Sequence, residues 1–205
     1  MASGDPTVDT WDGGCVIAGM LGGLSFTNNV VAGNQAVHAG GVALYDLPQG
    51  GMVTNNTLSG NGDTGLLVVG ISTTITFENN IVAGHTVGIS VTERSTATVN
   101  YTLWDGNVTD LGGSGVYSQT HAVIGDPAFA DPGHHDFRLT LGSAAINAGD
   151  PAGVPPAPAE DAEGVMRPIG VAVDLGAYEW QGYWRHLPLV ARTGAWPSVG
   201  RLETR

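Results

Sequence analysis

The residues best suited to hold a metal ion occur within one short stretch in the second half of the chain. Carboxylates and imidazoles gather there at His121, Asp126, Asp131, His134, His135 and Asp136. Mixed histidine and aspartate ligands suit Zn²⁺, whereas oxygen ligands alone suit Ca²⁺. Neighbouring side chains on an extended strand point to opposite sides, so at most one of His134 and His135 joins a given site. We weigh a Ca²⁺ or Zn²⁺ site against turn residues whose carboxylates accept backbone amides.

A second set of residues could carry acid–base chemistry in the first half of the chain. Asp46 and Glu93 each lie five residues after a glycine of a repeated phrase, and Arg94 follows Glu93 directly. If the phrase marks successive coils, two coil steps separate the two carboxylates by about 10 Å. That separation is wide even for a carboxylate pair that admits a water molecule, about 6.5–9.5 Å. The alternative is loop charge that is simply solvated.

These candidates must be positioned by a repeat that runs through the first half of the chain. Each copy opens with glycine and alternating apolar residues, and the glycines recur 27, 24 and 23 residues apart at Gly14, Gly41, Gly65 and Gly88. Paired asparagines keep the same step at Asn28-Asn29, Asn55-Asn56 and Asn79-Asn80. Repeats of this length indicate stacked units that bury an apolar face only together. Because no segment shows helical spacing, the pattern predicts an all-β solenoid of about four to five coils.

Alternation within each expected strand assigns its side chains to the inside or the outside of the solenoid. Val42 and Leu44 are expected to face inward, and so is Cys15 in the same register of the first copy. The paired asparagines are expected to stack from coil to coil, about 4.8 Å apart. The outward positions offer no acid, base or metal ligand, and we expect them to bind a partner through Tyr45, Leu67, Val69 and Thr92.

Charge and cysteine content limit the classes of function. The net charge is −12, lysine is absent, and four of the seven arginines lie between residues 180 and 205. Residues 1–179 therefore hold three arginines and 18 acids, a net charge of −15 that argues against nucleic-acid binding. A single cysteine rules out an internal disulfide. The longest apolar run, 66–71, is too short to cross a membrane, and no signal peptide is evident.

After Trp104 the repeat gives way to a series of short phrases. They are Asp126-Pro127-Ala128-Phe129, Asp136-Phe137-Arg138-Leu139, Ser143–Asp150, Arg167-Pro168 and Asp174–Glu179. In this order they resemble the C-terminal portion of bacterial secreted right-handed parallel β-helix proteins with a choice-of-anchor Q type ending, which are related in fold to pectate lyases. The chain departs from that pattern at Ala144 and Asn147, where the family usually has proline and aspartate.

The resemblance implies a right-handed parallel β-helix in three regions. Coils would occupy residues 1–125, and an irregular C-terminal cap would occupy residues 126–179. A tail containing tryptophan and arginine would follow at residues 180–205, either docked or partly disordered. It also implies an extracellular or cell-surface location for the parent protein. Relatives of pectate lyases act through Ca²⁺ with a basic residue or through paired carboxylates, and Asp46, Glu93 and Arg94 would be the residues to do so here.

We therefore expect a non-catalytic extracellular module that binds polysaccharide or a protein partner, because the outward face lacks reactive groups. The alternative is a carbohydrate-active or metal-dependent hydrolase or lyase, which rests on fold resemblance alone. The repeat begins within about a dozen residues of Met1, so we also expect the first coil to expose strand edges and to self-associate through residues 11–24.

Overall fold

The computed structural model describes residues 14–19, 22–152 and 158–182. Fifteen strands and one turn of 3₁₀ helix, η1 (Pro132–His134), make up the regular structure of these residues. No helix among them is long and apolar enough to span a membrane. The prediction of an all-β chain is confirmed.

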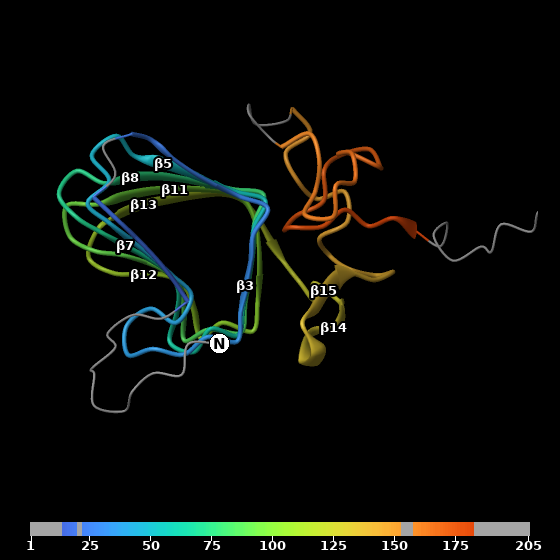
Figure 1. Ribbon diagram of the computed structural model, residues 1–205, viewed down its shortest axis with the longest axis horizontal. Coiled ribbons are helices and arrows are strands. Elements are labelled where there is room, and N and C mark those ends of the chain that lie inside the picture. The colour runs from blue at the N-terminus through green and yellow to red at the C-terminus, as the bar shows by residue number, and fades with distance from the viewer. Residues whose placement is uncertain (1–13, 20–21, 153–157, 183–205) are drawn as a thin grey trace, which may run out of the picture.

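Most strands belong to three parallel sheets that form the sides of a triangular tube (Figure 1). The first sheet contains β1 (Cys15–Ala18), β4 (Val42–Tyr45), β7 (Thr64–Val69), β10 (Val87–Val91) and β12 (Thr109–Gly112). The second contains β2 (Leu24–Thr27), β5 (Gly51–Thr54), β8 (Thr74–Glu78) and the first halves of β11 (Thr96–Asp105) and β13 (Val116–Ile124). The third contains β3 (Val30–Ala32), β6 (Thr57–Ser59), β9 (Ile81–Ala83) and the second halves of β11 and β13. The fold is a parallel β-helix with five strands stacked in its first sheet.

Inward-facing side chains stack in register and form a continuous core. Val42 pairs with Leu66, which pairs with Ile89, and all three are fully buried. These pairings confirm the inward positions that the alternation predicts. Cys15 pairs with Val42 as expected, but in the first coil it is only half-buried. Its burial raises the pKa of the thiol.

Asparagines close the corner between the second and third sheets. The first asparagine of each pair takes a left-handed φ of 54–57°, and Tyr101 and His121 continue the column with φ of 41° and 48°. The second asparagine bonds to the neighbouring coil. Asn56 Oδ1 accepts a hydrogen bond from Asn29 N at 2.8 Å, and Asn80 Oδ1 accepts one from Asn56 N at 2.7 Å. The expected stacking of asparagines from coil to coil is confirmed.

A second polar column lies at the corner between the third and first sheets, where a histidine replaces one asparagine. Asn61 Nδ2 donates to His85 Nε2 at 3.3 Å, and His85 Nδ1 lies 3.2 Å from Asn107 Oδ1. These partners require a neutral imidazole with its proton on Nδ1. His85 is 2% exposed, and burial lowers the pKa of its imidazole.

Residues 126–152 and 158–182 form a layer against the side of the tube that contains β3, β6 and β9 (Figure 1). The layer contains one antiparallel pair, β14 (Phe129–Asp131) and β15 (Asp136–Leu139). A hydrophobic cluster joins the layer to the tube and comprises Ile81, Ala83, Leu103, Leu139, Ala145 and Leu175. Most of the segment predicted as a cap is therefore a lateral layer, and its capping role stays a prediction. Residues 183–205 of the predicted tail lie outside the described residues.

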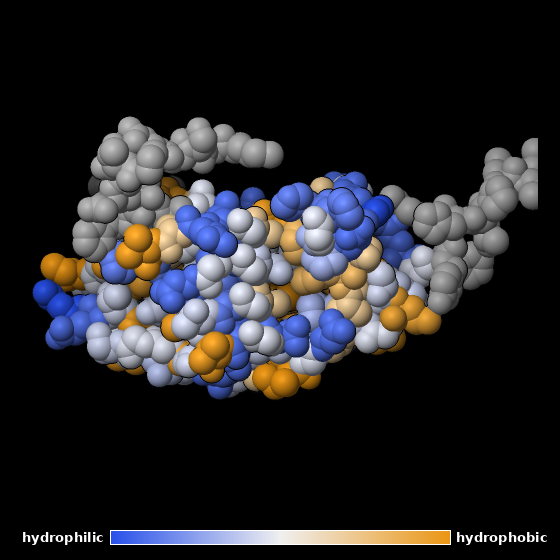
Figure 2. Space-filling view, turned by 90° about the horizontal axis from the view of Figure 1, so that it is seen from below, coloured by the Kyte–Doolittle hydropathy of each residue, from blue (hydrophilic) through white to orange (hydrophobic). Residues whose placement is uncertain are grey.

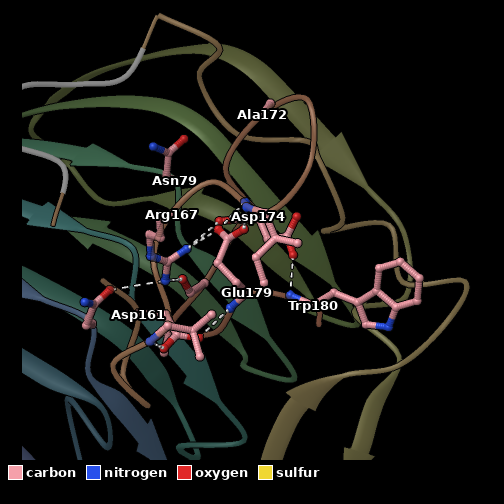
Figure 3. Close-up of polar contacts among 12 residues, drawn as sticks. Asn79, Asp161, Arg167, Ala172, Asp174, Glu179 and Trp180 are labelled. Carbon is pink, nitrogen blue, oxygen red and sulfur yellow. Dashed lines mark hydrogen bonds and ion pairs between the residues drawn. The ribbon is translucent and has the colours of Figure 1, made fainter. Parts of the chain in front are cut away.

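A buried ion pair holds this lateral layer together (Figure 3). Arg167 Nη1 lies 2.8 Å from Glu179 Oε1, and the two side chains are 1% and 0% exposed. The other terminal nitrogen of Arg167 donates to Asn28 Oδ1 at 3.2 Å, which ties the layer to the asparagine corner. Asp174 accepts the backbone amide of Trp180. The ion pair thus joins the two sequence phrases that contain Arg167 and Asp174–Glu179.

Replacing Asn56 with alanine should destabilise the tube. Asn56 is fully buried; its Nδ2 donates to Phe26 O at 2.9 Å, and its Oδ1 accepts the Asn29 amide. Buried polar groups that lose their partners cost about 1–3 kcal/mol each, so we expect Asn56→Ala to lower the free energy of unfolding by about 2–4 kcal/mol in urea titrations. Gln35→Ala, at an exposed position, should change it by less than about 0.5 kcal/mol. Equal losses in both variants would contradict this role for Asn56.

Stability should fall on acidification because of His85. The ordinary pKa of histidine is 6.5 and the folded value is lower, so the unfolded chain binds a proton more readily. The free energy of unfolding should therefore decrease as the pH falls below about 6.5, until the buried imidazole itself is protonated. Urea titrations across this range measure the slope. His85→Asn gives this position the asparagine found elsewhere in the column and should remove the contribution of His85 to the slope. An unchanged slope would assign the pH dependence to other groups.

Candidate functional site

A groove of about 550 Å³ lies on the outer face of the second sheet. Strands β5 and β8 and the loops before them supply its walls, which include Met52, Ser72, Thr74 and Thr76. Gly50 has a φ of 67°, and a Cβ there would lie 2.6 Å from Thr74 O, so only glycine lets this loop approach β8. Among the residues that the structure describes, no charged side chain lines the groove.

Five hydroxyl-bearing side chains form a regular grid on β8, β11 and β13, beginning at the groove. Strand pairing places Thr96 beside Thr74, and Thr98 between Thr76 and Ser118. The hydroxyls repeat about 6.7 Å apart along a strand and about 4.8 Å apart between strands. All five residues are exposed or half-buried, and none of the five hydroxyls bonds to another residue of the described ranges. We call these five residues the hydroxyl grid.

Some hydroxyl groups elsewhere in the tube bond to the protein's own backbone. Thr92 Oγ1 donates to Val68 O at 3.1 Å, and Ser95 Oγ donates to Gly70 O at 2.9 Å. The hydroxyl grid differs because its donors and acceptors are left to solvent or to a ligand. That arrangement suits a ligand that carries hydroxyl groups at a regular spacing, since each serine or threonine hydroxyl can both donate and accept.

The predicted binding residues lie on another side of the tube, mostly on the first sheet. Tyr45 pairs with Val69 across β4 and β7, and Leu67 occupies the same outer face. All three side chains are half-buried, and the Thr92 hydroxyl is already bonded to Val68. A binding role for Tyr45, Leu67, Val69 and Thr92 stays a prediction.

The candidate acid–base residues lie in exposed turns between the first and second sheets. Asp46 and Arg94 take left-handed φ values of 48° and 70°. Gly70 lies next to Asp46 in the coil stack, since a Cβ on it would be 2.7 Å from Asp46 Oδ1. Within the part of the chain that the structure describes, neither Asp46, Glu93 nor Arg94 forms an ion pair. An acid–base role for these three residues stays a prediction.

The candidate metal ligands of the β14–β15 hairpin make separate local contacts. His134 Nδ1 lies 2.8 Å from Asp131 Oδ2 in an exposed turn. Asp136 is paired with the Arg138 guanidinium, whose hydrogen bond is the main cause that lowers the pKa of Asp136. His135 ends η1 with a left-handed φ of 63°. These contacts support the interpretation of the hairpin residues as turn residues.

The two remaining candidate ligands lie at either end of the segment that enters the hairpin. Asp126 Oδ1 accepts the Ala128 amide at 2.7 Å. His121 stacks on Tyr101 with their ring centroids 4.4 Å apart. Among the residues that the structure describes, no group of three or more His, Cys, Asp or Glu side chains could hold a metal ion. The structure therefore brings Asp131 and His134 together as a pair, but it does not gather three or more of the predicted ligands.

One pair of carboxylates that the sequence pattern missed does come together. Asp105 and Asp126 both line a groove of about 350 Å³ beside the turns that contain Gly60, Gly84 and Gly106. Burial, and then the charge of Asp126, raise the pKa of Asp105. The register between coils would have predicted that the two carboxylates are close. Trp104 pairs with Ile124, so the residue one coil after Asp105 is the one directly before Asp126. A pair of neighbouring carboxyl groups can act as an acid and a base.

The side of the molecule seen from below mixes hydrophilic and hydrophobic residues (Figure 2). Hydrophobic side chains are interspersed with polar ones there, and this view shows no broad hydrophobic area. Large apolar patches mark the sites where proteins bind other proteins or membranes. The residues visible in this view, apart from those drawn in grey, form no such patch.

A family model described as a right handed beta helix region matches residues 9–125. The match covers more than half of the chain and extends to the end of β13. No curated protein and no solved structure matches the chain. The comparisons therefore support the β-helix fold and give no information on function.

Proposed function

The chain belongs to the right-handed β-helix family, and from this premise we propose that it is a non-catalytic module that binds a neutral polysaccharide. The binding surface is the hydroxyl grid together with the groove of about 550 Å³ beside it. The observation that carries the proposal is the set of five hydroxyl groups in register on three adjacent strands, none bonded to another described residue.

Threonine on a stacked sheet is suited to bind sugar rings. Its β-branched side chain has restricted rotation about χ1, so little side-chain entropy is lost when a ligand binds. Met52 adds an apolar contact in the groove for the C–H groups of a sugar. Because the coils repeat at a constant distance, an extended polymer meets the same kind of hydroxyl at each step.

Charge restricts the polysaccharide to a neutral one. Residues 1–179 carry a net charge of −15, which repels polyuronates and sulfated glycans. On the second sheet, the outward positions of β5, β8 and the first halves of β11 and β13 include one acid, Glu78, which is 5% exposed, and no arginine. A neutral polymer experiences none of this repulsion.

The competing partner is a protein, and the grid fits it less well. Protein interfaces depend on buried aromatic, arginine or large apolar residues at their centre. The hydroxyl grid has none of these, whereas polysaccharides present hydroxyl groups along their whole length. Polysaccharides of this kind are found mainly outside cells, so the proposal includes an extracellular or cell-surface location.

Removing two hydroxyls from the grid should weaken polysaccharide binding. Thr76→Val with Thr98→Val keeps the shape of both side chains and deletes only their hydrogen bonding. Each lost hydrogen bond costs about 0.5–1.5 kcal/mol, so we expect affinity to fall by roughly 10-fold or more. The measurement is affinity electrophoresis or calorimetry with β-glucan, xylan, soluble chitin oligosaccharides and polygalacturonate.

Thr109→Val is the matched control, because Thr109 is an exposed threonine of the first sheet. It should bind as the unmodified chain does. Binding to no neutral polysaccharide of the panel, or equal affinity in the double variant and the control, would refute the proposal. Preference for polygalacturonate would refute the argument from charge.

A second candidate function is glycoside hydrolysis at Asp105 and Asp126. The raised pKa of Asp105 beside a second carboxylate favours it, because hydrolysis requires one protonated acid and one ionised base. Asp105 would donate a proton to the leaving oxygen. Asp126 would activate the attacking water, although its Oδ1 already accepts the Ala128 amide.

If this second function holds, Asp105→Asn and Asp126→Asn should each reduce hydrolysis of a responsive polysaccharide. General acid–base catalysis contributes about 10²–10⁴-fold, so we expect losses of about 100-fold or more. Asp63→Asn is the control, because Asp63 is an exposed acid that directly precedes β7 of the first sheet. Hydrolysis that persists in both variants, or is absent from the unmodified chain, would exclude this candidate and leave the binding proposal unaffected.

A further inference from the structure

Glu78 is a buried acid at the junction between the tube and the lateral layer. It ends β8 in the same outward row as Thr74 and Thr76, yet it is only 5% exposed. Asp150 of the layer lies against it. The Asp150 amide donates to Asn79 Oδ1 at 2.9 Å, and a hydrogen bond joins the carboxyl groups of Asp150 and Glu78. One carboxyl group of the tube therefore meets one of the layer.

Among the residues that the structure describes, no basic side chain forms an ion pair with Glu78 or Asp150. On the tube, β5 places Thr54 beside Glu78, and β11 contributes Asn100, whose Nδ2 donates to Glu78 Oε1 at 3.4 Å. β13 contributes one titratable group, His121, whose Nδ1 lies 2.9 Å from Asn100 Oδ1. The neighbours of Glu78 on the tube therefore supply hydrogen bonds but no cation paired with the two carboxyl groups.

The lateral layer does not neutralise the pair either. Its two arginines among the described residues are paired with Glu179 and Asp136 instead. Two carboxyl groups in contact cannot both be ionised at low cost, so the pair holds a proton between them. Burial, and then the charge of Asp150, accordingly raise the pKa of Glu78 to about 7.

The asparagine corner beside this pair is poorly supplied with hydrogen bonds. Asn55 and Asn79 are fully buried, but neither polar atom of the Asn55 side chain, nor Asn79 Nδ2, bonds to another described residue. Buried polar groups without partners cost about 1–3 kcal/mol each, and they regain partners when water reaches them. The contact between the layer and this corner can therefore open at little cost.

We propose that Glu78 and residues 149–152 form a proton-dependent latch between the tube and the lateral layer. In the closed latch one proton bridges Glu78 and Asp150, and the Asp150 amide stays bonded to Asn79. Loss of that proton leaves two carboxylates in contact, and their repulsion separates the segment from β8. The rest of the layer stays attached through the hydrophobic cluster that joins it to the tube.

Closure of the latch should weaken as the pH rises. A carboxyl group whose pKa is raised in the closed state binds its proton more tightly there, so closure is favoured at low pH and is lost as the pH rises through about 7. With an ordinary pKa of 4.5 in the open state, the closing equilibrium should fall about 10-fold between pH 6 and pH 8. This slope has the opposite sign to the one expected from His85, so the test requires a local reporter.

The Asp150 amide is that reporter, because it donates to Asn79 Oδ1 only while the latch is closed. Its protection against hydrogen exchange, measured by NMR on the full chain and corrected for the intrinsic rate at each pH, should fall about 10-fold between pH 6 and pH 8. Glu78→Gln replaces the shared proton with a permanent amide donor, so protection should stay constant over this range. Glu93→Gln, at an exposed acid, is the control and should retain the fall.

Constant protection of the Asp150 amide in the unmodified chain would overturn the proposal, as would the same fall in Glu78→Gln as in the control. A second measurement follows the Glu78 carboxyl carbon by NMR. Titration near pH 7 would support the latch, whereas titration near the ordinary value of 4.5 would overturn it. Neither measurement involves a polysaccharide, so failure of this proposal leaves the proposed binding function standing.

Discussion

Hydrogen bonds between coils at the corners of the tube are the constraint on which the rest of the structure depends. A parallel sheet satisfies its own backbone, but each corner leaves amides and carbonyls without sheet partners. Asn56 and Asn80 bond to these groups in the neighbouring coil, with Asn80 Nδ2 donating to Val53 O at 2.8 Å. The corners can then bend sharply while every coil keeps its register with the next one.

This constraint leaves only the outer positions available for function. Inward side chains are buried in the core, and the side-chain amides of Asn56 and Asn80 are occupied by coil-to-coil bonds. On one side of the tube, Ile81 and Leu103 are covered by the lateral layer through Leu175. The second sheet remains as a side where uncharged hydroxyls are aligned from coil to coil and open to a ligand.

The site could be predicted only in part, because chemistry depends on partners that spacing does not show. The alternation of Thr74 with Thr76 and of Thr96 with Thr98 is visible in the sequence, yet it does not tell which hydroxyls bond to backbone. Asp131, His134 and Asp136 are close in sequence, but Asp131 and His134 pair with each other whereas Asp136 pairs with Arg138. Asp105 and Asp126 are far apart in sequence and meet because one coil step lies between them.

The sequence by itself determined the period, the inward positions and the asparagine corners, because each is a local pattern that recurs with every coil. Only the tertiary structure decided where residues 126–152 and 158–182 lie, since their phrases have no repeat to extrapolate. It also decided that β13 ends the stack with an open edge and that the hydroxyl grid is free. The physical reason is that stacking is set by neighbours one coil apart, whereas exposure depends on whatever else folds against the surface.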